Sequence, residues 1–309
     1  MADRPDDCSD STDAPMAKAS DFHPEVLRLF DRYVHGLIDR RVFLSRAARY
    51  AAAGMTAAGL LEALSPRFAY AQKVPKDDPR LTTETIQFDS PEGYGKASGY
   101  LVRPVGATGK LPGVLVVHEN RGLNPHIEDI ARRVALDGYV AFAPDALFPL
   151  GGYPGSEDKA RELFSKLEQA KTREDFVAAA KWLSNHASTK DSIGVVGFCY
   201  GGGIANLLAT RLPEIAAAAP YYGPAPSADQ VARIKARMAI HYAGNDERIN
   251  AGLPAYEEAL KSAGIQYEVF VYPKTEHGFN NDTTPRYDEA AAKLSWERTM
   301  KLFDQTLKG

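Results

Sequence analysis

From about residue 80 onward, hydrophobic and polar positions alternate in blocks. Short apolar runs rich in β-branched residues are separated by longer stretches in which apolar residues recur three and four positions apart. The short runs, which predict strands, are ASGYLVRP, LPGVLVVHE, GYVAFAPD, SIGVVGF, AAAAPYYG, ARMAIHYAG and YEVFVYP. The longer stretches, which predict helices, lie around residues 125–137, 156–187, 200–211, 253–264 and 285–307. The alternation predicts an α/β fold with a mostly parallel central sheet and helices on both faces.

Residues at the ends of one predicted helix support this interpretation. Asn124 and Pro125 supply an N-cap and a proline at the first helical position, and Gly138 closes the helix before the next strand. Loops between strands and helices are where such sheets carry their chemistry.

The first 71 residues form an extension to a domain that spans residues 72–309. The pair Arg40–Arg41 precedes an apolar VFL and a run rich in small residues that ends in Ala69-Tyr70-Ala71. This pattern resembles a twin-arginine export signal cleaved after Ala71, which implies contact with the export machinery and a periplasmic or secreted protein. The alternative is a cytoplasmic protein with an amphipathic helix packed on the domain, since HPEVLRLFDRYVHGLIDRR has helical apolar spacing.

Composition narrows the class of partner. The longest uncharged run of the extension, from Tyr50 to Leu61, has 12 residues. A bilayer-spanning helix needs about 20, so no stable membrane anchor is expected. The net charge of −3 on 309 residues provides no basic surface for nucleic acid. We therefore expect a small-molecule partner.

Removal of the extension would leave one cysteine. The chain has Cys8 and Cys199, so the mature protein would form no internal disulfide and no cysteine-based metal site. Cys199 lies in GFCYG, after a predicted buried strand and before a predicted helix, which is the context of a nucleophile elbow with cysteine in place of serine. The elbow is so sharp that Gly197 and Gly201 must be nearly free of side chains. The alternative is a small buried hydrophobic residue, which free cysteine often is.

An elbow nucleophile needs a base and an acid downstream, the acid first. Of the two downstream histidines, His241 lies inside a predicted strand, whereas His277 lies in the loop after one and is our candidate base. Asp246 and Glu247 follow a strand end, and Asp246 is preferred because it is nearer to that end. Its alternative role is to cap a helix. Asp282 is too close to His277 in sequence to be the usual partner.

The loop after LPGVLVVHE predicts the rest of the site. We assign the two oxyanion-hole donors to the backbone N–H groups of Asn120 and Tyr200. Glu119 would face the nucleophile. There its negative charge disfavours the thiolate, and it can accept the thiol proton. The alternative is a solvated loop carboxylate. The sequence HENRG lacks the second histidine of H-E-x-x-H, so no metal and no cofactor are expected.

These motifs, in this order, resemble the dienelactone hydrolase (carboxymethylenebutenolidase) family of the α/β-hydrolase fold, from about residue 80 to the C-terminus. The resemblance implies a Cys199–His277–Asp246 triad that opens lactones or cleaves carboxylic esters through an acyl-thiol intermediate. It also implies that Glu119 holds the resting thiol protonated until substrate frees the thiolate.

The chain departs from the family at the substrate carboxylate. The family places one arginine after the strand that here ends in PDALFPLGGYPG, and another four residues after the catalytic histidine, where this chain has Asn281. Arg121 and Arg286 are candidate replacements, because a guanidinium pairs bidentately with a carboxylate, although each is equally compatible with a surface position. Tyr153, Tyr200 and Phe279 are candidate pocket-lining residues, with simple packing as the alternative.

Two other functions use the same residues. One is a thiol esterase or thioesterase of broad specificity, and the other is a non-catalytic binder that keeps the pocket without turnover. A complete set of nucleophile, base and acid argues against the binder.

Overall fold

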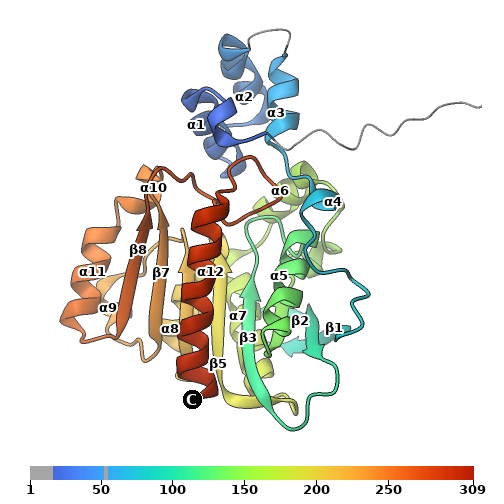
Figure 1. Cartoon of the computed structure of the whole chain (residues 1–309), viewed down its shortest axis with the longest axis vertical. Coiled ribbons are helices and arrows are strands. Elements are labelled where there is room, and N and C mark those ends of the chain that lie inside the picture. Colours follow the sequence, from blue (N-terminus) through green and yellow to red (C-terminus); the bar gives the residue numbers. More distant parts are fainter. Residues whose placement is uncertain (1–16, 52–54) are drawn as a thin grey trace, which may run out of the picture.

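The computed structural model describes residues 17–51 and 55–309, and in it the predicted strands assemble into one twisted sheet (Figure 1). The strands are β1 (Leu81–Ser90), β2 (Gly95–Pro104), β3 (Leu111–Val117), β4 (Val140–Pro144), β5 (Thr189–Phe198), β6 (Ile215–Tyr221), β7 (Arg237–Ala243) and β8 (Tyr267–Tyr272). Their order across the sheet is β1-β2-β4-β3-β5-β6-β7-β8. The sheet is parallel from β4 to β8, while β2 runs antiparallel to β4 and β1 antiparallel to β2.

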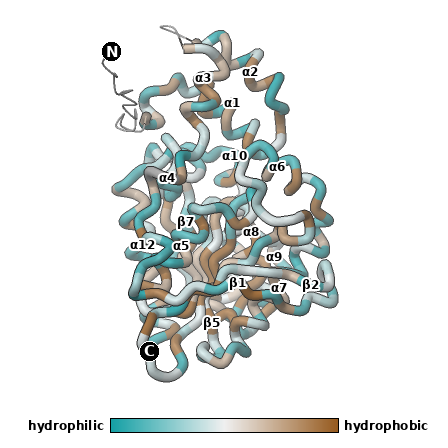
Figure 2. The backbone as a smooth tube through the Cα atoms, turned by 90° about the vertical axis from the view of Figure 1, so that its right-hand side faces the viewer, coloured by the Kyte–Doolittle hydropathy of each residue, from teal (hydrophilic) through white to brown (hydrophobic). Residues whose placement is uncertain are grey.

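Helices cover both faces of this sheet, as predicted for an α/β-hydrolase fold. The helices of this domain are α5 (Pro125–Leu136), α6 (Glu157–Ser165), α7 (Gln169–Ser184), α8 (Tyr200–Arg211), α9 (Ala228–Val231), α10 (Glu247–Asn250), α11 (Leu253–Ser262) and α12 (Glu289–Phe303). Helices α7, α8 and α11 pack in one apolar cluster, and α5 and α12 in another on the opposite face. In Figure 2 the most hydrophobic backbone lies along the strands between these layers. Asn124 caps α5 by accepting a hydrogen bond from the Ile127 N–H, at 3.2 Å, which confirms that prediction.

The structure differs from the prediction in two places. No strand was predicted before residue 97, yet β1 forms there, because it is an edge strand on which only Phe88 and Ser90 are buried. Such a strand shows no apolar run. The single helix expected over 156–187 is two helices, since the chain turns after Ser165 and buries Leu167 before α7 begins.

The N-terminal residues form a separate helical unit above one end of the sheet (Figure 1). It contains α1 (Pro24–Val34), α2 (Arg40–Ala47) and α3 (Ala57–Leu64), and we call residues 24–64 the helical cap. The cap has an apolar cluster of its own, in which Phe43, Ala47 and Leu64 are completely buried. A short helix, α4 (Phe68–Ala71), leads from the cap to the sheet domain. Among the described residues, no helix combines the length and the apolar character that crossing a bilayer requires.

Candidate active site

Cys199 occupies a sharp turn between β5 and α8. Its backbone has φ 57° and ψ −111°, a conformation that is uncommon for any residue with a side chain. A Cβ added to Gly197 would lie 2.0 Å from the carbonyl oxygen of Gly201, and one added to Gly201 would lie 2.3 Å from that of Val117. The predicted need for glycine at both positions is therefore confirmed, because no side chain fits at either.

His277 and Asp246 meet beside this turn. Nδ1 of His277 lies 2.5 Å from Oδ2 of Asp246, and both side chains are buried. Nε2 of His277 has no hydrogen-bond partner among the described residues. This nitrogen and the Cys199 Sγ belong to a cluster in which the candidate ligand atoms lie within 4.8 Å of one another. The arrangement gives the imidazole a fixed orientation by the carboxylate and an open nitrogen beside the sulfur.

The other candidates for base and acid are engaged elsewhere. His241 is a core residue of β7 that contacts the Tyr272 hydroxyl at 2.9 Å and the Thr299 hydroxyl at 3.1 Å. Asp282 pairs with Arg133 at 2.7 Å. Asp246 also caps the short helix α10, since its Oδ1 accepts a hydrogen bond from the Ile249 N–H at 3.3 Å. The catalytic and capping interpretations of Asp246 are therefore both compatible with its geometry.

The surroundings of the thiol favour its ionised form. Burial by itself raises the pKa of Cys199, but the positive charges of His277 and His35 outweigh burial and lower the pKa to about 6. The neighbouring thiolate in turn raises the pKa of His277 against the opposing effect of burial. Both pKa shifts favour the thiolate–imidazolium form of the pair.

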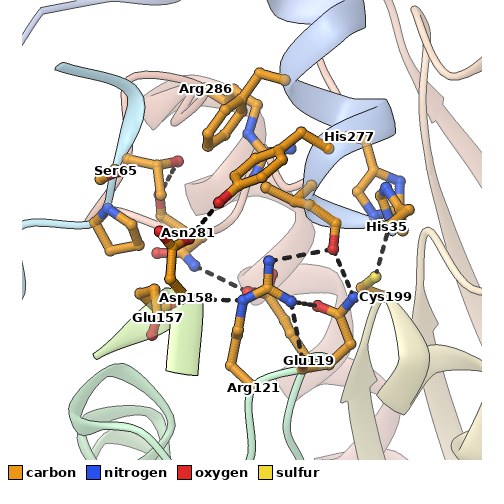
Figure 3. Close-up of a pocket in the computed structure, with 16 residues that line it drawn as sticks. His35, Ser65, Glu119, Arg121, Glu157, Asp158, Cys199, His277, Asn281 and Arg286 are labelled. Atoms are coloured by element: carbon orange, nitrogen blue, oxygen red, sulfur yellow. Dashed lines mark hydrogen bonds and ion pairs between the residues drawn. The ribbon is translucent and has the colours of Figure 1, made fainter. Parts of the chain in front are cut away.

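His35, at the end of α1 in the helical cap, is the residue that sequence reasoning missed. Its Nε2 lies 3.3 Å from the Cys199 Sγ (Figure 3). Its Nδ1 lies 3.1 Å from an Asp31 carboxylate oxygen. The Asp31–His35 pair thus faces the same sulfur as Asp246–His277. The helical pattern of residues 24–34 was visible in the sequence, but no motif places the end of that helix at the thiol.

The loop after β3 contributes further residues to the cavity at the thiol. His118 is fully buried, and its Nε2 accepts a hydrogen bond from the Ala146 N–H at 3.1 Å, so it supports the loop. Glu119 accepts a hydrogen bond from the Asn281 side chain at 3.2 Å. The Tyr200 N–H is in the first turn of α8, where N–H groups have no acceptor within the helix. Asn120 belongs to the same loop as Glu119, as the oxyanion assignment requires.

Both candidate arginines are buried at the site, so the surface interpretation is wrong for each. Arg121 donates to the Asn120 side-chain oxygen at 2.6 Å and lies 3.6 Å from a Glu157 carboxylate oxygen. Arg286 stacks over the Phe30 ring at 5.1 Å, and two of its guanidinium nitrogens have no hydrogen-bond partner among the described residues. Arg286 therefore has N–H groups available to an anion, whereas the Arg121 nitrogen without a hydrogen-bond partner, Nε, faces the Glu157 carboxylate.

Two aromatic predictions need correction. Tyr153 donates a hydrogen bond to Glu157 at 2.9 Å, and Phe279 is fully buried against Tyr222 and Tyr272. Neither side chain lines a cavity at Cys199, because both pack behind the residues that do. Tyr200 does line one of the cavities, as predicted.

Two cavities meet at the thiol, and Val34 and His35 of the cap line both of them. The polar chamber, of about 40 Å³, is lined by Glu119, Arg121, Glu157, Asn281 and Arg286 (Figure 3). The second cavity, of about 370 Å³, is lined by Phe164, Leu167, Tyr200, Tyr222, Pro224 and Ile249 among others, and we call it the apolar chamber, although Arg161 and Arg248 also line it. His35 and Cys199 belong to the walls of both.

One set of side chains has the donor types of a metal site. His35, Cys199 and His277 would supply two nitrogens and one sulfur, which Zn²⁺ accepts in proteins. However, Arg248 places a guanidinium nitrogen 3.0 Å from Nε2 of His35, the atom that would ligate. Its positive charge opposes a bound cation, so the set does not fit a resident metal.

Comparison with known proteins finds similarity over most of the sheet domain. The model of the dienelactone hydrolase family matches residues 97–307, and a second model, described as YqhI-like, matches residues 14–52. A putative carboxymethylenebutenolidase of Salmonella typhi is 34% identical over 220 residues, which cover 67% of this chain and 82% of that protein. A putative hydrolase fragment of Escherichia coli, YghX, is 54% identical over 114 residues, covering 37% of this chain and 97% of the fragment. Among solved structures, a putative dienelactone hydrolase from Klebsiella pneumoniae superposes with a TM-score of 0.64 at 30% identity, covering 72% of this chain and 99% of that one.

Proposed function

Because this chain belongs to the dienelactone hydrolase family and is a hydrolase of ester or lactone bonds, we propose that Cys199, His277 and Asp246 form its catalytic triad. The observation that carries the proposal is the convergence of a buried, oriented imidazole on a thiol held in a nucleophile elbow. The elbow presents the sulfur at the start of α8, where the free N–H groups and the helix dipole favour negative charge.

The chemistry follows from this geometry. The Cys199 thiolate attacks the carbonyl carbon, and the backbone N–H groups of Asn120 and Tyr200 stabilise the resulting oxyanion. The bond to the leaving oxygen breaks, and that oxygen receives the proton held on the imidazolium of His277. The acyl group is now on the sulfur. A water molecule then gives a proton to His277 and attacks the acyl carbon, which releases the carboxylic acid and the thiolate.

The polar chamber supports a substrate class. Arg121 and Arg286 line it. Two guanidinium nitrogens of Arg286 have no hydrogen-bond partner among the described residues, and the one such nitrogen of Arg121 lies 3.6 Å from Glu157. A substrate carboxylate would satisfy them, because a carboxylate accepts bidentate hydrogen bonds from arginine. We therefore propose that these two residues bind the carboxylate of an acidic lactone. They would take the role of the two family arginines that the chain lacks.

A second candidate, a thiol esterase of broad specificity, is favoured by the apolar chamber. Its volume of about 370 Å³ is within the range of small-molecule pockets, and apolar side chains share its walls with Arg161 and Arg248. A neutral ester would reach Cys199 through this chamber without contact to Arg121 or Arg286, which do not line it.

The test uses the full chain with Cys8→Ala, so that Cys199 is the one thiol. Hydrolysis of a dienelactone and of p-nitrophenyl acetate is followed, with Cys199→Ala as control. We expect turnover that the substitution abolishes, and an acetylated Cys199 that mass spectrometry detects after rapid acid quenching. Equal turnover by the Cys199→Ala variant would refute the proposed nucleophile.

Export is a separate proposal. Arg40 and Arg41 are exposed at the start of α2, where a recognition machinery has access to them, and α4 ends at Ala71, the predicted cleavage residue. We expect Arg40→Lys/Arg41→Lys to retain the protein in the cytoplasm and the unchanged chain to reach the periplasm without residues 1–71. Cell fractionation with immunoblotting checks both. Cytoplasmic retention of the unchanged chain at full length would refute the export hypothesis.

A further inference from the structure

The helical cap is an addition to the hydrolase domain. The dienelactone hydrolase family model begins at residue 97, and 72% of this chain accounts for 99% of the Klebsiella structure. The cap also has its own apolar core around Phe43. Such a unit can dock and separate while the domain beneath it keeps its fold.

Polar contacts hold the cap on the domain. Tyr33 donates a hydrogen bond from its hydroxyl to Asp158, and Arg161 donates to the Tyr33 carbonyl at 3.1 Å while stacking on the Tyr33 ring. Arg40 also pairs with Asp158, at 3.0 Å. Interfaces of this polar type are characteristic of domains that move relative to one another.

The end of α1 occupies the polar chamber. The Val34 carbonyl accepts hydrogen bonds from the Asn120 side chain at 2.9 Å and from Arg121 at 3.1 Å. Carbonyl groups at a helix C-terminus carry partial negative charge and lack acceptor partners within the helix. The Val34 carbonyl oxygen therefore contacts Arg121 as an oxygen of a substrate carboxylate would, since both carry negative charge.

A left-handed turn makes this placement possible. Gly36 has φ 73°, and the backbone N–H groups that follow α1 turn back onto the carbonyls of Arg32 and Tyr33. The turn leaves the Val34 carbonyl free to point away from its own helix. With the carbonyl and His35 in place, only about 40 Å³ of the polar chamber is open. That is room for a few water molecules and less than a lactone needs.

We propose that the helical cap determines substrate specificity, by filling the carboxylate-binding part of the active site with the end of α1. The inference rests on the proposed function and deepens it. With the cap docked, neutral esters reach Cys199 through the apolar chamber, whereas acidic substrates must first displace the Val34 carbonyl. Once the cap is released, Arg121 and Arg286 become available and acidic substrates bind.

The test compares two chromogenic esters of equal chain length. p-Nitrophenyl hemisuccinate carries a carboxylate where p-nitrophenyl butyrate carries a methyl group. The measured quantity is the ratio of kcat/KM for the acidic ester to that for the neutral one, in the full chain and its variants. This ratio cancels any loss of active protein, because both esters use the same enzyme preparation.

Two full-chain variants release the cap and leave every residue of the sheet domain unchanged. Because Gly36 also lines the apolar chamber and Phe43 lines neither chamber, the Phe43 variant distinguishes cap release from a direct effect on the neutral-ester path. Gly36→Val strains the turn, because a β-branched residue tolerates positive φ poorly. Phe43→Ala removes a completely buried side chain from the core of the cap. The matched control is Gly264→Val, since Gly264 also follows a helix, has φ 65° and has open space around its Cβ position, but lines neither chamber.

We expect both cap variants to raise the ratio at least about tenfold, because a tethered occupant competes at roughly millimolar effective concentration. Gly264→Val should leave the ratio unchanged. An unchanged ratio in both cap variants, with hydrolysis of the butyrate ester retained, would overturn the inference while leaving the triad intact. Loss of hydrolysis of both esters in variants that still unfold cooperatively would also overturn it, since the cap would then be required for catalysis. Absence of any Cys199-dependent hydrolysis in the unchanged chain would instead refute the proposed function.

Discussion

The charge of His277 should control the ionisation of Cys199, and His277→Ala tests this directly. The thiol pKa of about 6 reflects the two nearby imidazoles acting against burial. At pH 7 a thiol with that pKa is roughly 90% ionised, whereas one with an unshifted pKa of about 9 is roughly 1% ionised. Loss of His277 leaves burial opposed by His35 alone. The thiol pKa should therefore rise toward 9, and the thiolate fraction at pH 7 should fall by as much as roughly 90-fold.

The reaction rate changes much less than the thiolate fraction. A more basic thiolate is a better nucleophile, by a factor of about 16 to 32 for three pKa units. The rate of alkylation at pH 7 should therefore fall only about three- to sixfold. The midpoint of the pH profile is the decisive quantity, because it reports the pKa whatever the intrinsic reactivity of the sulfur.

The assay measures iodoacetamide alkylation against pH in a Cys8→Ala background. Because the folded protein lowers the thiol pKa, reactivity should rise as the pH passes about 6 and then level off. In His277→Ala the rise should move toward pH 9. His186→Ala is the control, since His186 follows α7 at the opposite end of the sheet from the elbow. Identical midpoints in His277→Ala and the unchanged chain would refute the assignment of this charge to His277.

The same profile tests the predicted role of Glu119. If Glu119 keeps the resting thiol protonated, the unchanged chain should react with a midpoint near that of a free thiol, and Glu119→Gln should lower it. The structure pairs Glu119 with Asn281 and brings two imidazoles to the sulfur, which favours the ionised thiol at rest. We therefore expect Glu119→Gln to leave the midpoint near 6.

Other predictions concern the orienting acid, the elbow and the carboxylate contact. Asp246→Asn should lower kcat by about 10³-fold or more with little change in KM, because the imidazole loses its orienting charge, and steady-state kinetics on p-nitrophenyl acetate check this. Gly197→Ala should destabilise the fold by about 3 kcal/mol or more, since its Cβ would overlap the Gly201 carbonyl, and urea unfolding measures the change. Arg286→Gln, introduced together with Gly36→Val, should raise KM for the hemisuccinate ester about tenfold or more and leave the butyrate ester unaffected, because it removes a charge-assisted contact. An equal effect on both esters would assign Arg286 a structural role.

The elbow was predictable because its requirements are local. Gly197, Cys199 and Gly201 are close in sequence, and the backbone sterics that exclude side chains at the two glycines act within a single turn. The contact between the candidate base and the candidate acid was predictable for a related reason. Parallel strands end at the same edge of the sheet, so loops after β7 and β8 must lie near one another. Asp246 and His277, one from each loop, are in contact.

The features that sequence reasoning missed depend on distant or weakly patterned contacts. Strand β1 carries polar residues on its exposed face, and it is defined by its pairing with β2 rather than by hydrophobicity. His35 contacts a sulfur 164 positions away in the chain. That contact depends on how the cap docks, which is set by side chains such as Asp158 and Arg161 on another helix. No periodicity within α1 encodes that docking.

The cap and the export hypothesis bear on one another, because the cap lies entirely before the predicted cleavage site. Cleavage after Ala71 would remove α1, and with it the Val34 carbonyl and His35, from the active site. An exported enzyme would then have its polar chamber open, whereas the uncleaved chain would keep it filled. Protein purified from the periplasm should accordingly show the high ratio of acidic to neutral ester hydrolysis expected of the Gly36→Val variant. The same cleavage should raise the pKa of Cys199 and lower its thiolate fraction at neutral pH. The reason is that loss of His35 removes one of the two positive charges that lower the pKa of Cys199.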